Sequence, residues 1–133
     1  MGQSLEVRIE QVGPSTAKGI ARTHSVLIDR PVAKGGEDRG PLGGEYLLLA
    51  LGGCFMSNLL AAIRAREAPI SDVRIVVNAT IEAAPDRFTA LALTIAATHQ
   101  DAELMAKLVT IAERSCIVTN TLRSGVPIAL TIE

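Results

Sequence analysis

The longest apolar stretch of this chain runs over Tyr46–Ile63 and carries Gly52, Gly53 and Cys54 in its middle. The length would suit a membrane span, but the two glycines and the polar residues that follow make it a poor one. We therefore expect no membrane insertion and predict a helix over Glu45–Arg66. Because the middle of this helix is apolar on every side, other parts of the protein must cover it on several sides.

Composition narrows the class of protein further. The 133 residues suit a single domain over residues 1–133, or a small domain that a partner completes. Hydrophobic residues make up 48% of the chain and aromatic residues only 2%, so the core must be aliphatic. The apolar fraction excludes a disordered chain. A net charge of −1 without a basic block excludes the usual nucleic-acid binders.

The N-terminal residues and the two cysteines indicate the cellular compartment in which we expect the protein. Glu6, Arg8 and Glu10 leave no uninterrupted apolar segment of the kind a signal peptide needs. We therefore expect a cytoplasmic protein, in which Cys54 and Cys116 do not form a permanent disulfide. Two distant cysteines fit neither a disulfide framework nor a zinc site. Nor does the sequence contain a cofactor motif, so we expect neither cofactor nor metal.

The order of the predicted elements indicates an α+β fold with largely antiparallel sheets. Alternating apolar residues predict strands, and apolar residues at helical spacing predict helices. In chain order we predict strands Leu5–Glu10 and Ile20–Asp29, a loop over Arg30–Gly44, the apolar helix, a hairpin of strands Val73–Ala84 and Arg87–Thr98, a helix over Ala102–Ser115 with Asp101 as its N-cap, a short helical turn at Thr119–Ser124, and a last strand Val126–Ile132.

The candidate for chemistry is the segment Gly52-Gly53-Cys54. Each glycine costs a helix about 0.5–1 kcal/mol relative to alanine, so something must approach the helix closely at this level. Close packing with Cys54 as a small apolar residue is one interpretation, and a reactive thiol is the other. A reactive thiol must ionise, which apolar surroundings disfavour. The second interpretation therefore requires a cation from outside the helix, from Arg30, Lys34 or Arg39, or from a partner subunit.

Cys116 follows the second predicted helix and is either a core residue or a partner for Cys54. If the two helices lie side by side, the two thiols come within disulfide range. Such a pair makes a peroxide-reducing cycle possible. Cys54 would be oxidised to a sulfenic acid, Cys116 would condense with it to a disulfide, and a dithiol would restore both thiols.

Three segments resemble the OsmC/Ohr family. They are Gly35-Gly36-Glu37-Asp38-Arg39-Gly40-Pro41, then Glu45-Tyr46-Leu47-Leu48-Leu49-Ala50-Leu51-Gly52-Gly53-Cys54, and finally Ala112-Glu113-Arg114-Ser115-Cys116 followed by Asn120-Thr121-Leu122. The resemblance extends over nearly the whole chain, including the order of its elements.

The resemblance implies an intertwined homodimer in which antiparallel sheets wrap two long central helices. It further implies a thiol-dependent peroxidase that reduces organic hydroperoxides or hydrogen peroxide, with a dithiol reductant such as a lipoylated protein or thioredoxin. Cys54 matches the peroxidatic cysteine and Cys116 the resolving one. The resemblance also implies an arginine and a glutamate near the reactive thiol. Arg39 is our first choice for this arginine, with Arg30 second, and Glu45 is the candidate for this glutamate.

The chain departs from the well-characterised peroxidases of the family at two places. Gly44 stands where their glutamate would be, and Ile117 follows Cys116 where the related branch often has proline. On an ideal helix, the neighbouring Glu45 lies about 180° around from Cys54. These departures place the chain among the less characterised OsmC-like proteins. They also leave open a non-enzymatic binding or redox-sensing module that uses the same apolar interface pocket, and a dimeric scaffold in which both thiols are core residues.

Overall fold

The computed structural model describes residues 2–133. The chain divides into two compact units, Met1–Leu47 and Leu48–Glu133. The predicted α+β class is confirmed, since antiparallel sheets and helices make up the chain. The single domain over residues 1–133 stays a prediction.

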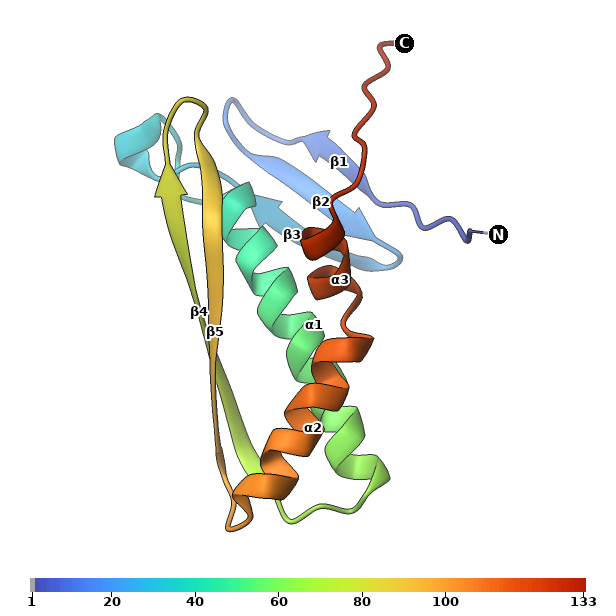
Figure 1. Cartoon of the computed structure of the whole chain (residues 1–133). Coiled ribbons are helices and arrows are strands. Elements are labelled where there is room, and N and C mark those ends of the chain that lie inside the picture. Colours follow the sequence, from blue (N-terminus) through green and yellow to red (C-terminus); the bar gives the residue numbers. More distant parts are fainter. Residues whose placement is uncertain (1) are drawn as a thin grey trace. The chain divides into compact units, whose positions relative to one another are not determined.

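The first unit contains a three-stranded antiparallel sheet in the order β1-β2-β3 (Figure 1). Its strands are β1 (Arg8–Gln11), β2 (Ala17–Ala21) and β3 (His24–Ile28). The prediction of one strand over Ile20–Asp29 is wrong, because a tight turn separates β2 from β3 and Ala21 pairs with His24. Arg22 in this turn has φ of 56°, a left-handed conformation that is uncommon for arginine and that the sequence therefore does not predict.

The predicted loop after β3 folds back on the end of that strand. It contains one short 3-10 helix, η1 (Val32–Lys34). The backbone N–H of Asp29 donates to Pro41 O at 3.0 Å, and that of Asp38 donates to Arg30 O at 2.9 Å. Gly36 lies so close to this backbone that a Cβ there would be 1.9 Å from Arg30 O. The loop is therefore tied along its length and has a defined shape.

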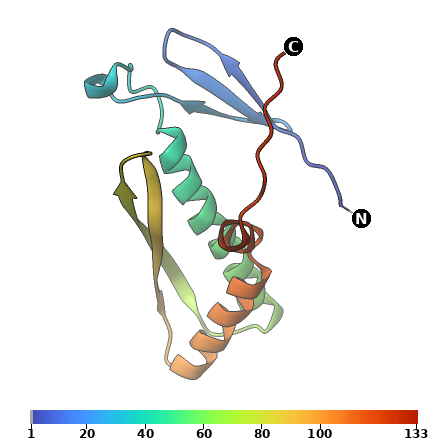
Figure 2. The ribbon, with the colours of Figure 1, turned by 45° about the horizontal axis from the view of Figure 1, so that its top comes forward.

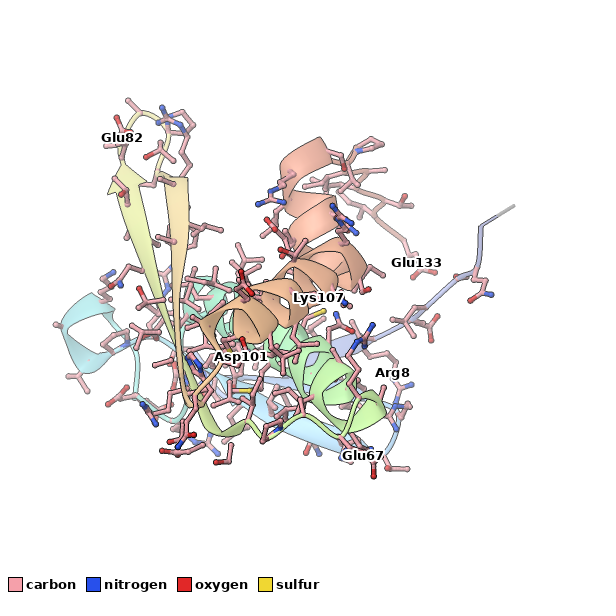
Figure 3. All side chains as sticks on the ribbon, turned by 60° about the horizontal axis from the view of Figure 1, so that its bottom comes forward. Arg8, Glu67, Glu82, Asp101, Lys107 and Glu133 are labelled. Atoms are coloured by element: carbon pink, nitrogen blue, oxygen red, sulfur yellow. The ribbon has the colours of Figure 1, made fainter. Side chains whose placement is uncertain are left out.

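The second unit is a long hairpin with helices on one face (Figures 1 and 2). Its strands are β4 (Ser71–Glu82) and β5 (Arg87–Thr98), and its helices are α1 (Gly43–Ala65), which begins in the first unit, α2 (Ala102–Ser115) and α3 (Ile117–Ser124). The helix predicted from Glu45 thus begins at Gly43. The α2 prediction is confirmed, including its N-cap, because Asp101 Oδ1 accepts from the backbone N–H of Leu104 at 3.0 Å (Figure 3).

The core of the second unit lies between the hairpin and the helices. On the face of the hairpin that meets the helices, Ile75 pairs with Ile95 and Val77 with Leu93. Leu59 of α1 and Leu108 of α2 are fully buried, with 0% exposure. The core is mainly aliphatic, as composition predicted, and its other members are Phe55, Met105 and Cys116. It fixes α1, α2 and the hairpin together, and this arrangement positions both cysteines.

The last predicted strand, Val126–Ile132, is wrong for the chain by itself. Residues 125–133 contain no helix or strand. The alternating apolar residues of this tail are largely exposed, with Ile128 at 86%, Leu130 at 94% and Ile132 at 98%. A pattern of period two favours extended backbone, but a strand also needs hydrogen-bonding partners on a neighbouring strand.

Within residues 2–133, the apolar helix α1 is buried along one side. It buries Leu51, Phe55 and Leu59, whereas Leu49 is 59% exposed and Leu60 is 44% exposed. By length and composition α1 could cross a membrane, with a mean hydropathy of 1.9 over its most apolar window, of which 28% is buried. Core helices of other proteins meet the same criteria of length and hydropathy. The prediction that other parts of the protein cover α1 on several sides stays a prediction.

Candidate active site

The second unit brings the two cysteines together. Cys54 lies in the middle of α1 and Cys116 lies at the junction of α2 and α3. Both are free thiols in the same apolar core, Cys54 partly exposed and Cys116 fully buried. The Cys54 side chain approaches Cys116 closely enough to help lower the pKa of its thiol. The spatial pairing that the sequence left conditional on side-by-side helices is therefore present.

Gly52 explains how α1 comes so close to the hairpin. A Cβ at Gly52 would lie 3.0 Å from Val77 Cγ2, tighter than ordinary van der Waals contact. The close neighbour that the glycine pair predicted is thus a strand of the sheet. Gly53 is different, because a Cβ there would meet nothing within 4 Å. Among the residues that the structure describes, packing explains the first glycine but not the second.

Cys116 is the N-cap of α3, and its Sγ accepts from the backbone N–H of Thr119 at 3.5 Å. Burial of the Cys116 thiol by itself raises its pKa, since a buried charge loses its hydration. Hydrogen bonds from Thr119, Cys54 and the backbone of Val118 act in the other direction and outweigh burial. The net result is a lowered pKa, so the Cys116 thiolate is favoured relative to an ordinary cysteine.

Two polar residues beside the sulfurs were missed by the sequence reasoning. Asn58 Nδ2 lies 3.9 Å from Cys54 Sγ, one helical turn further along α1. Thr119 lies beside Cys116 and is 9% exposed. Both could have been found from spacing. A polar side chain one turn after a helical cysteine shares its face, and the third residue after a capping position supplies a free N–H.

Arg39 lies in the first unit, where its backbone N–H donates to Asp29 Oδ2 at 3.2 Å. Its guanidinium lies over the turn between β1 and β2, and Nη1 would be 3.6 Å from a Cβ at Gly13. The side chains of Arg30, Lys34 and Arg39 are all exposed. Their approach to Cys54, like the choice among them, stays a prediction.

Glu45 occupies the first turn of α1 and closes it. Its Oε1 accepts from the backbone N–H of Leu42 at 2.8 Å. A glutamate in the first turn that reaches back to the N-cap residue is one half of a capping box, which satisfies a backbone donor at the helix start. This contact gives Glu45 a structural role. Its catalytic role stays a prediction.

A small cavity of about 370 Å³ lies at the opposite end of α2 from Cys116. Ser71, His99 and Asp101 are among its lining residues, and His99 Nδ1 is buried there with no hydrogen-bond partner in the part of the chain that the structure describes. Among the described residues 2–133, no group of three or more histidine, cysteine and acidic side chains is placed to hold a metal ion.

The family model described as OsmC-like protein matches residues 35–131. No curated protein matches the chain. Among solved structures, an OsmC-like protein from Mycoplasma pneumoniae has 17% identity and a TM-score of 0.78, with 92% of this chain and 89% of that chain covered.

Two further structures with similar folds have names that refer to peroxides. An organic hydroperoxide resistance protein from Elizabethkingia anophelis has 16% identity and a TM-score of 0.70, with 92% of this chain and 91% of that chain covered. One named organic hydroperoxide resistance protein OsmC, from Legionella pneumophila, has 16% identity and a TM-score of 0.65, with 91% and 90% covered. At such identity, the likeness establishes the fold.

Proposed function

Because the chain belongs to the OsmC-like protein family, we propose that it is a thiol-dependent peroxidase for organic hydroperoxides or hydrogen peroxide. The observation that carries the proposal is the contact between Cys54 and Cys116 in an apolar core. Two relatives of the same fold are named organic hydroperoxide resistance proteins, which supports a hydroperoxide as substrate.

In the first step, the thiolate of Cys54 attacks the outer oxygen of the hydroperoxide. The O–O bond breaks, the alcohol leaves as its alkoxide and takes up a proton, and Cys54 becomes a sulfenic acid. The partial exposure of Cys54 suits this role, because a peroxide must reach its sulfur. Full burial of Cys116 suits a resolving thiol that meets only Cys54.

In the second step, the sulfur of Cys116 attacks the Cys54 sulfenic acid and a disulfide forms with release of water. An external dithiol, such as a lipoylated protein or thioredoxin, then reduces this disulfide. A cytoplasmic, reducing compartment would supply such dithiols. No bound cofactor is needed, because the two thiols supply the two electrons that reduce the peroxide when they become a disulfide.

A cation is still required to favour the Cys54 thiolate for the first step. We assign this role to Arg39, with Arg30 as the alternative, because both stand in the loop that Asp29 holds in shape. Glu45 would orient the arginine only if its carboxylate left the backbone N–H of Leu42. The structure therefore supports the role of the arginine better than a role of Glu45 beside it.

We further propose that the working form is a homodimer. The exposed apolar side of α1, with Leu49 and Leu60, and the exposed apolar tail, with Ile128 and Leu130, are surfaces that a monomer would leave in water. A second copy would cover the helix and give the tail a strand to pair with. The open space beside Gly53 fits close approach of such a copy.

The peroxidase proposal is tested with cumene hydroperoxide and dihydrolipoamide, following peroxide loss. Wild type should turn over, and Cys54→Ser should not. In the absence of the dithiol, Cys116→Ser should consume about one equivalent of peroxide and accumulate a sulfenic acid that dimedone traps, since the resolving thiol is gone. Turnover by wild type no faster than by Cys54→Ser would refute the proposal.

The second candidate is a non-enzymatic binding or redox-sensing module. It is favoured by Gly44, which stands where the family's glutamate would be, and by the capping role of the neighbouring Glu45. In that case Cys54 should react slowly with iodoacetamide, and mass spectrometry should find no Cys54–Cys116 disulfide after peroxide treatment. A disulfide within one subunit that a dithiol reduces would favour the peroxidase.

A further inference from the structure

Thr119 meets the resolving sulfur with two polar groups. Its backbone N–H lies 3.5 Å from Cys116 Sγ, and its side chain helps lower the pKa of the Cys116 thiol. Thr119 is itself 9% exposed, and Cys116 is 0% exposed. The contact is therefore largely shielded from water, where a hydrogen bond to a charged sulfur has more effect than at a surface.

The position of this contact in the fold adds to its effect. Cys116 ends α2 and caps α3, so its sulfur lies at the N-terminal end of an eight-residue helix. Free N–H groups at such an end favour negative charge. Cys54 approaches the same sulfur from α1. The α3 terminus thus holds Cys116 Sγ against the thiol with which it would react.

Charged groups near Cys116 are otherwise occupied or exposed. Glu113, in the last turn of α2, pairs with Arg123 of α3 at 2.6 Å on the outer surface. Arg114 is exposed. Cys54 is the ionisable group that approaches the sulfur from α1, and the α3 contacts come from Thr119 and the N–H of Val118. Neutral hydrogen-bond donors therefore act directly on Cys116 Sγ.

We propose that Thr119 is a positioning residue for disulfide formation, whose polar groups hold Cys116 Sγ beside Cys54. This inference rests on the proposed function and extends it to the second step. The Cys116 thiolate attacks the sulfur of the Cys54 sulfenic acid, the S–S bond forms and the S–OH bond breaks. Hydroxide leaves and takes up a proton to become water.

The test compares two matched variants. Thr119→Val keeps the shape of the side chain and loses the hydroxyl, whereas Thr119→Ser keeps the hydroxyl and loses the methyl group. Both retain the backbone N–H, and circular dichroism with a melting curve checks that they fold. In a Cys54→Ser background, ¹³Cβ NMR of labelled cysteine follows the ionisation of Cys116. We expect a higher midpoint for Thr119→Val than for the parent, and a midpoint near the parent for Thr119→Ser.

The second readout is the rate of disulfide formation in single turnover. With both cysteines present, one equivalent of cumene hydroperoxide should give sulfenic acid at the same rate in all proteins. The following disulfide step should be about tenfold slower in Thr119→Val, the effect of losing one hydrogen bond to a charged group. Thr119→Ser should restore it. An unchanged midpoint or an unchanged disulfide rate in Thr119→Val would overturn the inference.

Diamide separates this inference from the peroxidase proposal. Diamide accepts two electrons by forming an adduct with one thiolate, which the second thiolate displaces to give the disulfide and the hydrazine. The reaction involves no peroxide, so it follows the attack by Cys116 even if wild type fails to reduce peroxides. Slower displacement in Thr119→Val, restored in Thr119→Ser, supports the role of Thr119. Equal rates in all three proteins refute it.

Discussion

The hydroxyl of Thr16 donates a hydrogen bond of 2.8 Å to Asp29 Oδ2, and each of the two residues is only 2% exposed. The same carboxylate accepts from the backbone N–H groups of Arg30 at 2.7 Å and Arg39 at 3.2 Å. Asp29 therefore joins the start of β2 to both ends of the loop that carries the candidate arginines. Burial of this carboxyl opposes its ionisation, but the hydrogen bonds outweigh burial and hold its pKa well below the usual range.

Removing the Thr16 hydroxyl should destabilise this loop. Thr16→Val keeps the volume of the side chain but leaves a buried carboxylate oxygen short of a donor, so we expect the melting temperature to fall by about 3–8 °C. Thr16→Ser is the matched control, because it retains the hydroxyl, and its melting temperature should fall less. Equal losses in the two variants would assign the effect to packing.

The stability of the protein should depend on Asp29 at acid pH. The carboxyl has a lower pKa in the folded than in the unfolded chain, where it is about 3.9. The folded state is therefore favoured by this group above pH 4, and the contribution is lost as the pH falls below about 4. Melting temperatures of wild type and Asp29→Asn, measured between pH 2 and pH 7, should converge toward the acid end. Parallel curves would contradict this account.

The N-cap of α2 offers an independent test of local stability. Asp101→Ala removes the acceptor for the Leu104 N–H and should lower the free energy of unfolding by about 0.5–2 kcal/mol. Asp101→Asn keeps an acceptor oxygen and should lose only a small part of this. Urea denaturation of the three proteins measures the difference. A loss in Asp101→Asn as large as in Asp101→Ala would point to the charge of Asp101 in place of the cap.

The apolar tail provides the test of the proposed dimer. In a monomer, Ile128 and Leu130 are almost fully exposed, so the double change Ile128→Asp and Leu130→Asp should alter stability little. In a homodimer that pairs this tail, the same change would bury two charges and weaken association strongly. We expect light scattering after size exclusion to give a dimer for wild type and mainly a monomer for the variant. A monomeric wild type would refute the dimer.

Much of the second unit could be predicted from local sequence. The alternation in Arg87–Thr98 and the helical spacing in Ala102–Ser115 gave both elements with the bounds that the structure has. Asp101 as N-cap followed from its residue type and place. In these elements, the backbone conformation and the buried face agree with the same short-range pattern.

The turn at Arg22 and the unpaired tail show where such patterns fail. Neither glycine, proline nor asparagine stands at the turn between β2 and β3, so the local signals favoured one continuous strand. In the tail, the alternation indicated a strand without indicating what it pairs with. Chain reversal and strand pairing depend on contacts with other segments, which periodicity within one segment does not contain.

For the candidate site, the sequence by itself determined the two cysteines, the glycine at close approach and the demand for a cation at Cys54. Only the tertiary structure decided that Cys116 meets Cys54 and is held by Thr119, and that Glu45 caps its own helix. The physical reason is the range of the interactions. Residue chemistry and helix propensity act within a few positions, whereas the environment of a sulfur is set by residues that packing brings from three helices into one core.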